Sequence, residues 1–353
     1  MTDMEPRIAA YLAHRMPAAR DIEIDEFRRI QGGSSQETYR LRARWREAGE
    51  TTNSQTTASQ TIERRLILRR APPSGLVVAE RDIEYTVYHA LAGRGVPVPA
   101  VYYFEADPRW LDRPFFVMDM MPGKPGHFYT STDPYEGHGE KIARQFWQHL
   151  GTLAAIDHRA LGLHDLRNGS VTGEYWSREL DWWEAIYRKN EGVIEPAVHA
   201  AIRWLLRNPP PPTIKPAIVH GDYRAGNFLF TPDGRISAIL DWEMCHIGDP
   251  LEDVAWAIDP FWPMTRHLPL EPGLTEWEQA SGFAVDRAAL DWWRLFSAVK
   301  ASAIWATAEA SFTHGPAREM VVAMSGIRAG HFHRKLILDM MANPTKIARG
   351  NGT

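Results

Sequence analysis

The sequence is poor in features that would assign it to several classes of protein. Its single cysteine, Cys245, excludes an internal disulfide and a multi-cysteine zinc site, and we expect a small buried thiol there. The formal net charge of −4 offers no basic excess for nucleic acid and no polybasic patch for a membrane. No apolar run approaches the roughly 18 residues that a membrane span needs. The N-terminal MTDMEPRIAAYLAHRM is charged early and has no apolar core typical of a signal peptide. We therefore expect a soluble, cytoplasmic protein.

What remains is an ordinary globular composition, with 44% hydrophobic and 24% charged residues among 353. This length is ample for a large core and favours two domains or lobes. The sequence contains no internal repeat.

Residues 1–121 have the pattern of strands around one main helix. Alternating or short apolar runs predict five strands, which are 22–30, 37–45, 64–70, 100–106 and 114–121. Helical spacing predicts a short helix over 5–17 and the main helix over 77–95, which closes on Gly93 and Gly95. The polar segment 46–61 is expected to be an exposed loop within a hairpin.

The character of the chain changes at MPGKPG (121–126), whose prolines and glycines predict a hinge or linker. Beyond it, apolar residues recur every three to four positions over 140–161, 174–190 and 197–208, and helices resume at Asp249. Short strands interrupt the helices between these regions. We expect one lobe from residues 1–121 and a second, mostly helical lobe from residues 122–353.

The segment of short strands between the helical regions has polar residues at the ends of its apolar runs. IVHGDYRAGNFLF (218–230) contains Asp222 and Asn227, and a second run ends at Asp241. The two runs flank Thr-Pro-Asp-Gly at 231–234, a strong turn signal, so they predict a hairpin. Because a hairpin folds the end of its second strand back to the start of its first, Asp241 should lie near Asn227, with Asp222 just upstream.

Two carboxylates gathered in this way repel by about 3 kcal/mol at about 5 Å and an effective dielectric near 20. A cation between them, or a chemical role for one of them, would explain the arrangement. The oxygen atoms of Asn227 and Asp241 suit Mg²⁺, with phosphate and water completing the octahedron. Asp222 is then left to face a hydroxyl group, and the spacing is that of kinase phosphoryl transfer.

The segments HGDYRAGNFLF, ILDWE and GDPLEDVAW resemble the three central motifs of the aminoglycoside phosphotransferase family, small-molecule kinases with a protein-kinase-like fold. The form with DWE and GDP is most similar to the branch related to the kinase domain fused to some acyl-CoA dehydrogenases. The resemblance implies a bilobal α+β fold, with a five-stranded antiparallel sheet plus helix and a mostly helical lobe that carries a small catalytic hairpin. It implies Asp222 as the catalytic base, and Asn227 and Asp241 as ligands that hold Mg²⁺ against the phosphates of ATP.

The same template requires a phosphate-binding turn and a cation in the nucleotide-binding lobe, residues 1–121. GGSSQET (32–38) offers the turn, with backbone N–H groups at Gly33, Ser34 and Ser35, although a plain hairpin loop is the alternative. The cation is expected on the third strand, where LILRR ends in two arginines in place of the usual lysine.

Strand alternation puts these two arginines on opposite faces, and we expect Arg69 to contact phosphate through its fork of N–H groups. The alternative is that both arginines are solvated at the strand end. Glu84 is the expected helical partner of Arg69, and Glu80, one turn earlier, is the alternative.

VMDMM (117–121) is predicted to be the connector at which adenine binds. Backbone groups of Asp119, Met120 and Met121 would meet the edge of the base, and Met118 would shape the pocket. An ordinary buried strand end is the alternative.

Asp249 looks like a helix N-cap, with a proline at the first helical position and Glu252 at the third. We expect Asp249 to be structural and to brace the expected catalytic loop, the segment that carries Asp222 and Asn227. We expect His158 and His220 to be framework residues. Only WEMCHIG separates Asp241 from Asp249, which leaves no room for the activation loop of a protein kinase. This spacing predicts a small-molecule acceptor.

The expected function is transfer of the γ-phosphate of ATP to a hydroxyl of a small molecule, with residues 122–353 supplying catalysis and the acceptor site. From Leu251 to the end, 11 acidic and 10 basic residues show no acidic excess for a polycation. Most aromatic residues there are expected in the core, and Phe261 and Trp262 could line an apolar pocket. We therefore favour an apolar or hydroxyacyl-type acceptor, with aminoglycoside phosphorylation, metal-dependent hydrolysis and a catalytically dead nucleotide-binding module as alternatives.

Overall fold

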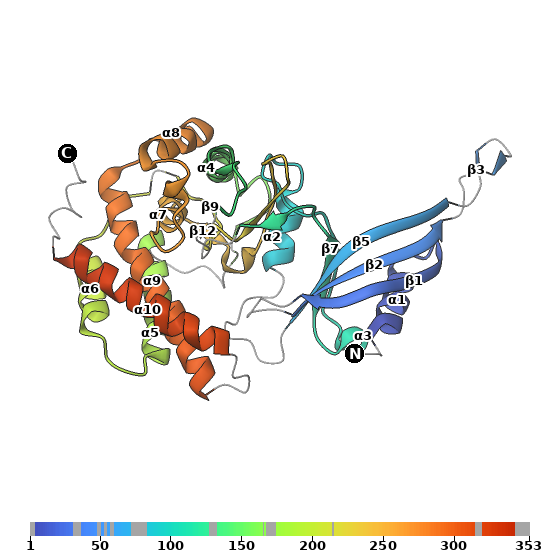
Figure 1. Cartoon of the computed structure of the whole chain (residues 1–353), viewed down its shortest axis with the longest axis horizontal. Helices are drawn as coiled ribbons and strands as arrows, with labels where there is room; N and C mark the ends of the chain where they lie inside the picture. The colour runs from blue at the N-terminus through green and yellow to red at the C-terminus, as the bar shows by residue number, and fades with distance from the viewer. Residues whose placement is uncertain are drawn as a thin grey trace. The chain divides into compact units, whose positions relative to one another are not determined.

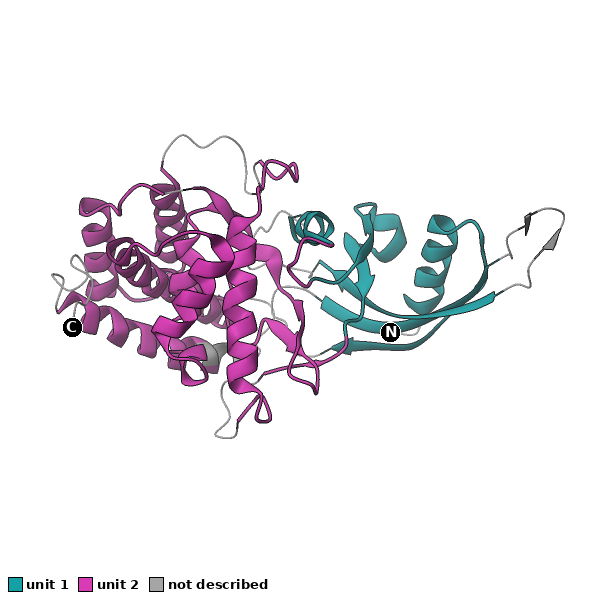
Figure 2. Ribbon diagram, turned by 90° about the horizontal axis from the view of Figure 1, so that it is seen from above, with its two compact units in different colours: residues 1–92, 98–121 teal, residues 93–97, 122–353 magenta. Residues whose placement is uncertain are grey.

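The computed structural model describes residues 4–30, 37–47, 51–52, 55–56, 60–71, 83–126, 133–164, 166, 174–213, 215–314 and 320–342. The chain divides into two compact units (Figure 2). Unit 1 holds residues 1–92 and 98–121, and unit 2 holds residues 93–97 and 122–353.

Unit 1 is built on a five-stranded antiparallel sheet. Its strand order is β1 (Ala19–Ile30), β2 (Glu37–Glu47), β5 (Gln60–Arg70), β7 (Phe115–Asp119) and β6 (Val101–Glu105). Side chains of β2 alternate between buried and less buried positions, as expected where one face of a sheet covers a core. The five predicted strands are therefore confirmed, although β1, β2 and β5 are longer than the sequence pattern indicated. Within the expected loop 46–61, β3 (Thr51–Thr52) pairs with β4 (Gln55–Thr56).

Among the described residues of unit 1, three helices accompany this sheet. Tyr11 and Leu12 of α1 (Met4–Arg15) join a hydrophobic core with Leu41 and Phe115 of the strands and with Leu111 of α3 (Pro108–Leu111). α2 (Ile83–Leu91) buries most of its side chains. It is shorter than the predicted helix 77–95, whose first six residues lie outside the described residues, and the chain turns at Gly93 with φ of +72°.

Unit 2 is mostly helical, as the sequence predicts (Figure 1). Its helices are α4 (Gly139–Ala155), α5 (Tyr175–Asn190), α6 (Pro196–Arg207), α7 (Leu251–Ala257), α8 (Leu270–Ser281), α9 (Arg287–His314) and α10 (Met320–Met341). α9 packs against α5, α6, α7 and α10, and α4 packs against α8. The side chains of α9 from Ala289 to Ala303 are buried almost all round, which is typical of a central helix. None of the described helices is long and apolar enough to cross a membrane.

Short strands lie among these helices. β10 (Phe228–Phe230) pairs with β11 (Ile236–Ile239) and with β8 (Lys124–Pro125), and β9 (Ala217–Val219) pairs with β12 (His246–Gly248). The 228–239 pair is the predicted hairpin. Its turn is closed by N–H donation from Gly234 to the carbonyl oxygen of Thr231 at 2.8 Å. The predicted linker 121–126 thus contains β8, which is paired to the hairpin.

Candidate active site

Asp222 follows β9 by three residues, and its carboxylate is held by three side chains of unit 2. Trp256 Nε1 and Arg224 Nε donate hydrogen bonds to Oδ1 at 2.8 and 2.9 Å, and Asn227 Nδ2 donates to Oδ2 at 2.6 Å. The carboxylate is mostly buried, with a side-chain exposure of 14%. The orientation of Asp222 is therefore set by residues 2, 5 and 34 positions away, as their sequence separations show.

Asn227 is oriented by the chemistry of its neighbours. Its Nδ2 also donates to the backbone carbonyl oxygen of Asp222 at 2.9 Å. Both partners are acceptors, so the amide nitrogen must face them, and the amide oxygen Oδ1 faces away from Asp222. Neither of these two hydrogen bonds uses the amide oxygen of Asn227.

Asp241 lies at the end of the hairpin and adopts a left-handed backbone conformation, with φ of +71° and ψ of 55°. A non-glycine residue in this region is uncommon, and such positions cluster at functional sites. The preceding residue, Leu240, donates its N–H to the carbonyl oxygen of Asn227 at 2.8 Å. The structure thus brings the backbone next to Asp241 against Asn227, as the hairpin argument predicts.

His220 is a framework residue, as expected. It is fully buried, and burial lowers its pKa to about 4, so the ring is neutral. Nδ1 accepts the N–H of Asp222 at 3.1 Å, which leaves Nε2 to donate to the carbonyl oxygen of Leu240 at 3.0 Å. One neutral imidazole therefore joins the start of the catalytic loop to the end of the hairpin. His158 is also structural, with Nδ1 2.7 Å from the carbonyl oxygen of Leu163.

The prediction that Asp249 braces the catalytic loop is wrong, because Asp253 does so. Asp253 accepts the backbone N–H groups of His220 at 2.6 Å and of Gly221 at 2.9 Å. Burial, and then the charge of Glu252, raise the pKa of Asp253 to about 7. The carboxylate of Asp249 instead accepts the N–H of Leu251 at 2.9 Å, beside the start of α7. Asp253 lies one helical turn further along, where its side chain reaches the loop.

The sequence pattern suggested that Glu252 closes a capping box with Asp249. The structure shows that its carboxylate bonds elsewhere. Its carboxylate is buried between Lys300 Nζ, at 2.8 Å, and His246 Nε2, at 3.0 Å. Burial opposes its ionisation, but Lys300 and His246 hold the pKa of Glu252 well below its usual range. Lys300 also donates to the carbonyl oxygen of Gly221 at 2.6 Å. Both the N–H and the C=O of Gly221 are thus fixed from α7 and α9.

Glu179, His246 and Glu252 place ligand atoms within 4.8 Å of one another, which is close enough for a metal ion. Lys300 already supplies a cation to this cluster through Glu252. The ammonium group also lies 4.9 Å from the ring centroid of Trp256. The cluster is therefore an internal ion-pair network that positions the catalytic loop.

In unit 1, Arg69 and Arg70 diverge from β5 as the alternation predicts. Arg69 forms an ion pair with Glu84 of α2 at 3.0 Å, and their side-chain exposures are 11% and 2%. Arg70 forms a buried ion pair with Glu37 at 2.6 Å. The alternative of two solvated arginines is wrong. Glu84 is the helical partner of Arg69, and Glu80 lies outside the described residues.

The predicted adenine-binding segment lies at the end of β7. Met118 is buried, and Met120 is exposed. The N–H groups of Asp119 and Met120 donate to the carbonyl oxygens of Ala100 and Arg65, at 2.9 and 3.0 Å. These two N–H groups therefore serve the sheet, and Met121 is the next donor along the chain. That backbone groups of Asp119 to Met121 meet the edge of a base stays a prediction. Gly33, Ser34 and Ser35 lie outside the described residues.

Several residues that shape this site were missed by sequence reasoning. Trp256 and Asp253 fall within the motif GDPLEDVAW, but the motif alone does not assign them to Asp222 or to the loop. Arg224 follows Asp222 closely, whereas Lys300 gives no signal, because it comes from a helix 79 residues beyond Gly221. Trp262, expected in an acceptor pocket, is 2% exposed and packs on Trp256. It therefore belongs to the core.

The remaining aromatic residues of the C-terminal region follow the expectation of a core. The buried ones are Trp256, Trp277, Trp292, Trp293 and Phe296. Phe261 and Trp305 are only partly buried. Cys245 is buried and forms no disulfide, as expected.

Comparison with known proteins identifies relatives of this chain. The profile described as the phosphotransferase enzyme family matches residues 26–296. Acyl-CoA dehydrogenase family member 11 of Gallus gallus is 32% identical over 207 residues, which are 57% of this chain and 26% of that protein. The chain thus spans about a quarter of the length of this curated relative.

Two solved structures are similar over nearly the whole chain. A candidate aminoglycoside phosphotransferase from Ralstonia eutropha has a TM-score of 0.70 at 21% identity, covering 96% of this chain and 98% of that one. A thermostable mutant of aminoglycoside phosphotransferase APH(4)-Ia, in a ternary complex with ADP and hygromycin B, has a TM-score of 0.55 at 16% identity, covering 98% and 99%. These likenesses confirm the expected α+β fold.

Proposed function

The chain belongs to the phosphotransferase enzyme family, as its three central motifs predict, and from this premise we propose that it transfers the γ-phosphate of ATP to a hydroxyl group of a small molecule. The observation that carries the proposal is the Asp222 carboxylate, oriented by Asn227, Trp256 and Arg224. Such an oriented carboxylate next to oxygen ligands is what kinase phosphoryl transfer requires.

Asp222 is the proposed base that aligns the acceptor hydroxyl. A carboxylate oxygen can accept about two hydrogen bonds. Oδ1 already accepts from Trp256 and Arg224, whereas Oδ2 accepts only from Asn227 among the described residues. The second position on Oδ2 is therefore the one at which an acceptor hydroxyl would donate. Positioning of this kind supplies much of the catalysis in phosphoryl transfer.

The residues at the end of the hairpin fit Mg²⁺. The amide oxygen of Asn227 faces away from Asp222, and Asp241 follows Leu240, whose N–H donates to the carbonyl oxygen of Asn227. Both ligand types are the hard oxygens that Mg²⁺ prefers. When bound, the ion would neutralise phosphate charge. We propose that Asn227 and Asp241 hold it.

In unit 1, Arg69 is the proposed phosphate contact, oriented by its ion pair with Glu84. A guanidinium held by a carboxylate keeps its charge and retains N–H groups for phosphate oxygens. The proposed phosphate turn is Gly33, Ser34 and Ser35. For adenine we propose the N–H of Met121 with the neighbouring Met118, Asp119 and Met120. The ADP in the APH(4)-Ia complex supports a nucleotide substrate for this fold.

The proposed acceptor is an alcohol on an apolar or mixed scaffold, such as a hydroxyacyl compound. It is supported by the relationship to acyl-CoA dehydrogenase family member 11 and by the balanced charge of residues 251–353. The hygromycin B in the APH(4)-Ia complex supports aminoglycosides as the second candidate. The Arg69–Glu84 pair argues against the catalytically dead module, because the proposed phosphate contact has the carboxylate partner that the family template predicts.

The test is incubation of the protein with Mg-ATP and a mixed extract of bacterial metabolites, followed by mass spectrometry. Asp222→Asn runs in parallel, and we expect it to fold and bind ATP but to lose about 10²-fold or more in turnover. A phosphorylated species made only by the intact protein would support the proposal and identify the acceptor class. ATP loss without a new phosphoester would favour hydrolysis, and absence of ATP binding would favour the dead module.

A further inference from the structure

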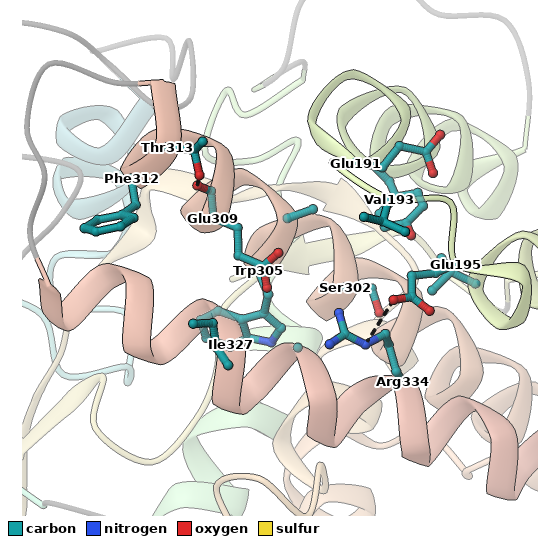
Figure 3. Close-up of a pocket in the computed structure, with 15 residues that line it drawn as sticks. Glu191, Val193, Glu195, Ser302, Trp305, Glu309, Phe312, Thr313, Ile327 and Arg334 are labelled. Carbon is teal, nitrogen blue, oxygen red and sulfur yellow. Dashed lines mark hydrogen bonds and ion pairs between the residues drawn. The ribbon is translucent and has the colours of Figure 1, made fainter.

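A second feature of unit 2 lies apart from the residues that hold Asp222. It is a cavity of about 550 Å³ between the end of α5, the start of α6, and helices α9 and α10 (Figure 3). Pockets of roughly 300–1,000 Å³ accommodate small-molecule ligands. The cavity is therefore large enough for a compact organic molecule.

The cavity gathers acidic residues from separate parts of the chain. Glu191 and Glu195 come from the α5–α6 connection, and Glu309 comes from α9. Arg334 of α10 is the cation that faces them, with Nε 3.6 Å from Glu195 Oε1. Glu191 accepts a hydrogen bond from His199 at 2.8 Å. The carboxylate of Glu309 makes no hydrogen bond or ion pair with any residue that the structure describes, so negative charge is in excess.

Aromatic and apolar side chains form the rest of the lining. Trp305 and Phe312 lie on the same helix as Glu309, and Ile327 faces them from α10 (Figure 3). Val193 is 76% exposed and lies at the rim. Aromatic faces beside carboxylates attract organic cations, because the ring quadrupole and the carboxylate both favour positive charge.

Tyr187 adds a polar group that the protein itself does not satisfy. Its side chain is 3% exposed and lines the cavity, and its hydroxyl has no hydrogen-bond partner among the described residues. Burial, and then the charges of Glu191 and Glu195, raise the pKa of Tyr187 to about 12, with a further contribution from Glu309. The hydroxyl group therefore lies in the electrostatic field of these carboxylates. A hydroxyl group that lines a cavity can form a hydrogen bond with a ligand or with water.

Buried side chains separate this cavity from Asp222. Trp305 donates from Nε1 to His333 Nδ1 at 3.1 Å. The His333 ring lies 6.0 Å from that of Trp262, which packs on Trp256, the donor to Asp222. The cavity-lining residues do not include those that contact Asp222. The cavity is therefore a distinct site.

We propose that this pocket binds a small organic ammonium cation with an apolar body, at a site separate from the phosphoryl-transfer centre. The ammonium group would lie near Glu309 and the Tyr187 hydroxyl, and the apolar body would lie against Trp305. An anion would meet an excess of carboxylates, which disfavours it. A neutral molecule would leave Glu309 unpaired.

The experiment uses benzyltrimethylammonium as the probe, titrated into the full chain by isothermal calorimetry. The probe carries no hydroxyl group and is not a phosphoryl acceptor, so its binding does not depend on the proposed function. Benzyl alcohol and benzoate are the neutral and anionic comparisons. Glu309→Gln and Tyr187→Phe test the pocket, and Glu271→Gln, an exposed carboxylate on α8, is the matched control.

We expect saturable binding of the cation only, weakened about tenfold or more by Glu309→Gln, since interactions with a charged group are worth a factor of this order. Tyr187→Phe should weaken it about threefold or more, and Glu271→Gln should leave it unchanged. Asp222→Asn should bind the probe like the intact protein. Absence of binding, equal binding of benzoate, or no effect of Glu309→Gln would overturn the proposal. Loss of binding in Asp222→Asn would overturn the separation of the two sites.

Discussion

At Gly221 the backbone turns with φ of +81°, and an added Cβ would overlap the carbonyl oxygen of Met244. The residue stands directly before Asp222, and its N–H and C=O are both held by buried side chains. Protein kinases usually carry an arginine at this position of the motif. The structure explains why glycine stands here, because no side chain fits between the loop and Met244.

We predict that Gly221→Ala lowers the free energy of unfolding by about 3 kcal/mol, from the left-handed conformation and the overlap together. Gly162→Ala is the matched control, because Gly162 also has φ of +72° but no atom near its Cβ position. It should cost only about 1 kcal/mol. Urea unfolding of both variants measures the difference. Equal losses of unfolding free energy in the two variants would show that the backbone at Met244 moves aside without destabilising the protein.

Arg69 is a second position at which one side chain should determine a measurable property, here the KM for ATP. Its ion pair with Glu84 orients a guanidinium where the family template has lysine. We predict that Arg69→Met raises the KM for ATP about tenfold or more, since it removes a charge-assisted phosphate contact. Arg69→Lys should recover part of the loss. Steady-state kinetics at varied ATP measures both.

Arg46→Met, which removes an exposed arginine of β2, is the control for the charge change and should leave the KM unchanged. A KM for ATP in Arg69→Met equal to that of the intact protein would remove Arg69 from the nucleotide site.

At the scale of elements, α7 and α9 together position the catalytic loop. α7 presents Glu252 and Asp253 on consecutive residues, one toward Lys300 and the other toward the loop backbone. α9 carries Lys300, which is fully buried. The catalytic loop begins at the end of β9, which pairs with β12. The hairpin consists of the paired strands β10 and β11. The catalytic loop therefore depends on helices that follow it in the chain.

We predict that Lys300→Met lowers the free energy of unfolding by about 3 kcal/mol or more, because it removes the ammonium partner of the buried Glu252 carboxylate. The same variant should lower kcat and change the KM for ATP less, since the carbonyl group of Gly221, next to Asp222, loses its hydrogen-bond donor. Lys335→Met is the control, because Lys335 forms an exposed ion pair with Asp339 on α10. Exposed pairs of this kind contribute little.

Urea unfolding and steady-state kinetics of the two lysine variants provide the test. If Lys300→Met unfolds like the control, the network does not stabilise unit 2. If its stability falls while its kcat is retained, Lys300 is structural alone and does not position Asp222.

At the scale of the whole molecule, buried titratable groups predict a dependence of stability on pH. Burial lowers the pKa of His149 and of His220 to about 4. The unfolded chain takes up these protons near pH 6.5, so the stability from both groups is present above that pH and is lost as the pH falls toward 4. Asp253 acts in the opposite sense, because its raised pKa adds stability as the pH falls below 7.

Two histidines outweigh one carboxyl group, so we predict that the free energy of unfolding is about 1–2 kcal/mol lower at pH 5 than at pH 7.5. His149→Leu should remove about 2 kcal/mol of this loss, and should leave a protein whose stability is nearly equal at the two pH values. Urea unfolding at both pH values measures it. A variant with an unchanged pH dependence would show that His149 titrates normally in the folded chain.

Much of the fold could be predicted from the sequence, because strand alternation, helical spacing and turn residues depend on neighbours along the chain. The five strands of unit 1, the hairpin of residues 228–239 and the main helices of unit 2 followed from these local patterns. The motif spacing likewise indicated the family and selected Asp222, Asn227 and Asp241 as one group. Each of these inferences uses residues less than about 40 positions apart.

Only the tertiary structure decided which distant side chains meet. Asp253, not Asp249, holds the catalytic loop, and Lys300 reaches Gly221 from 79 residues away. The charge count over residues 251–353 is balanced, yet Glu191 and Glu195 join Glu309 in an acidic cavity because α5, α6 and α9 pack together. Local backbone preferences do not specify such contacts. They arise when long-range packing brings together faces of elements that the sequence lists far apart.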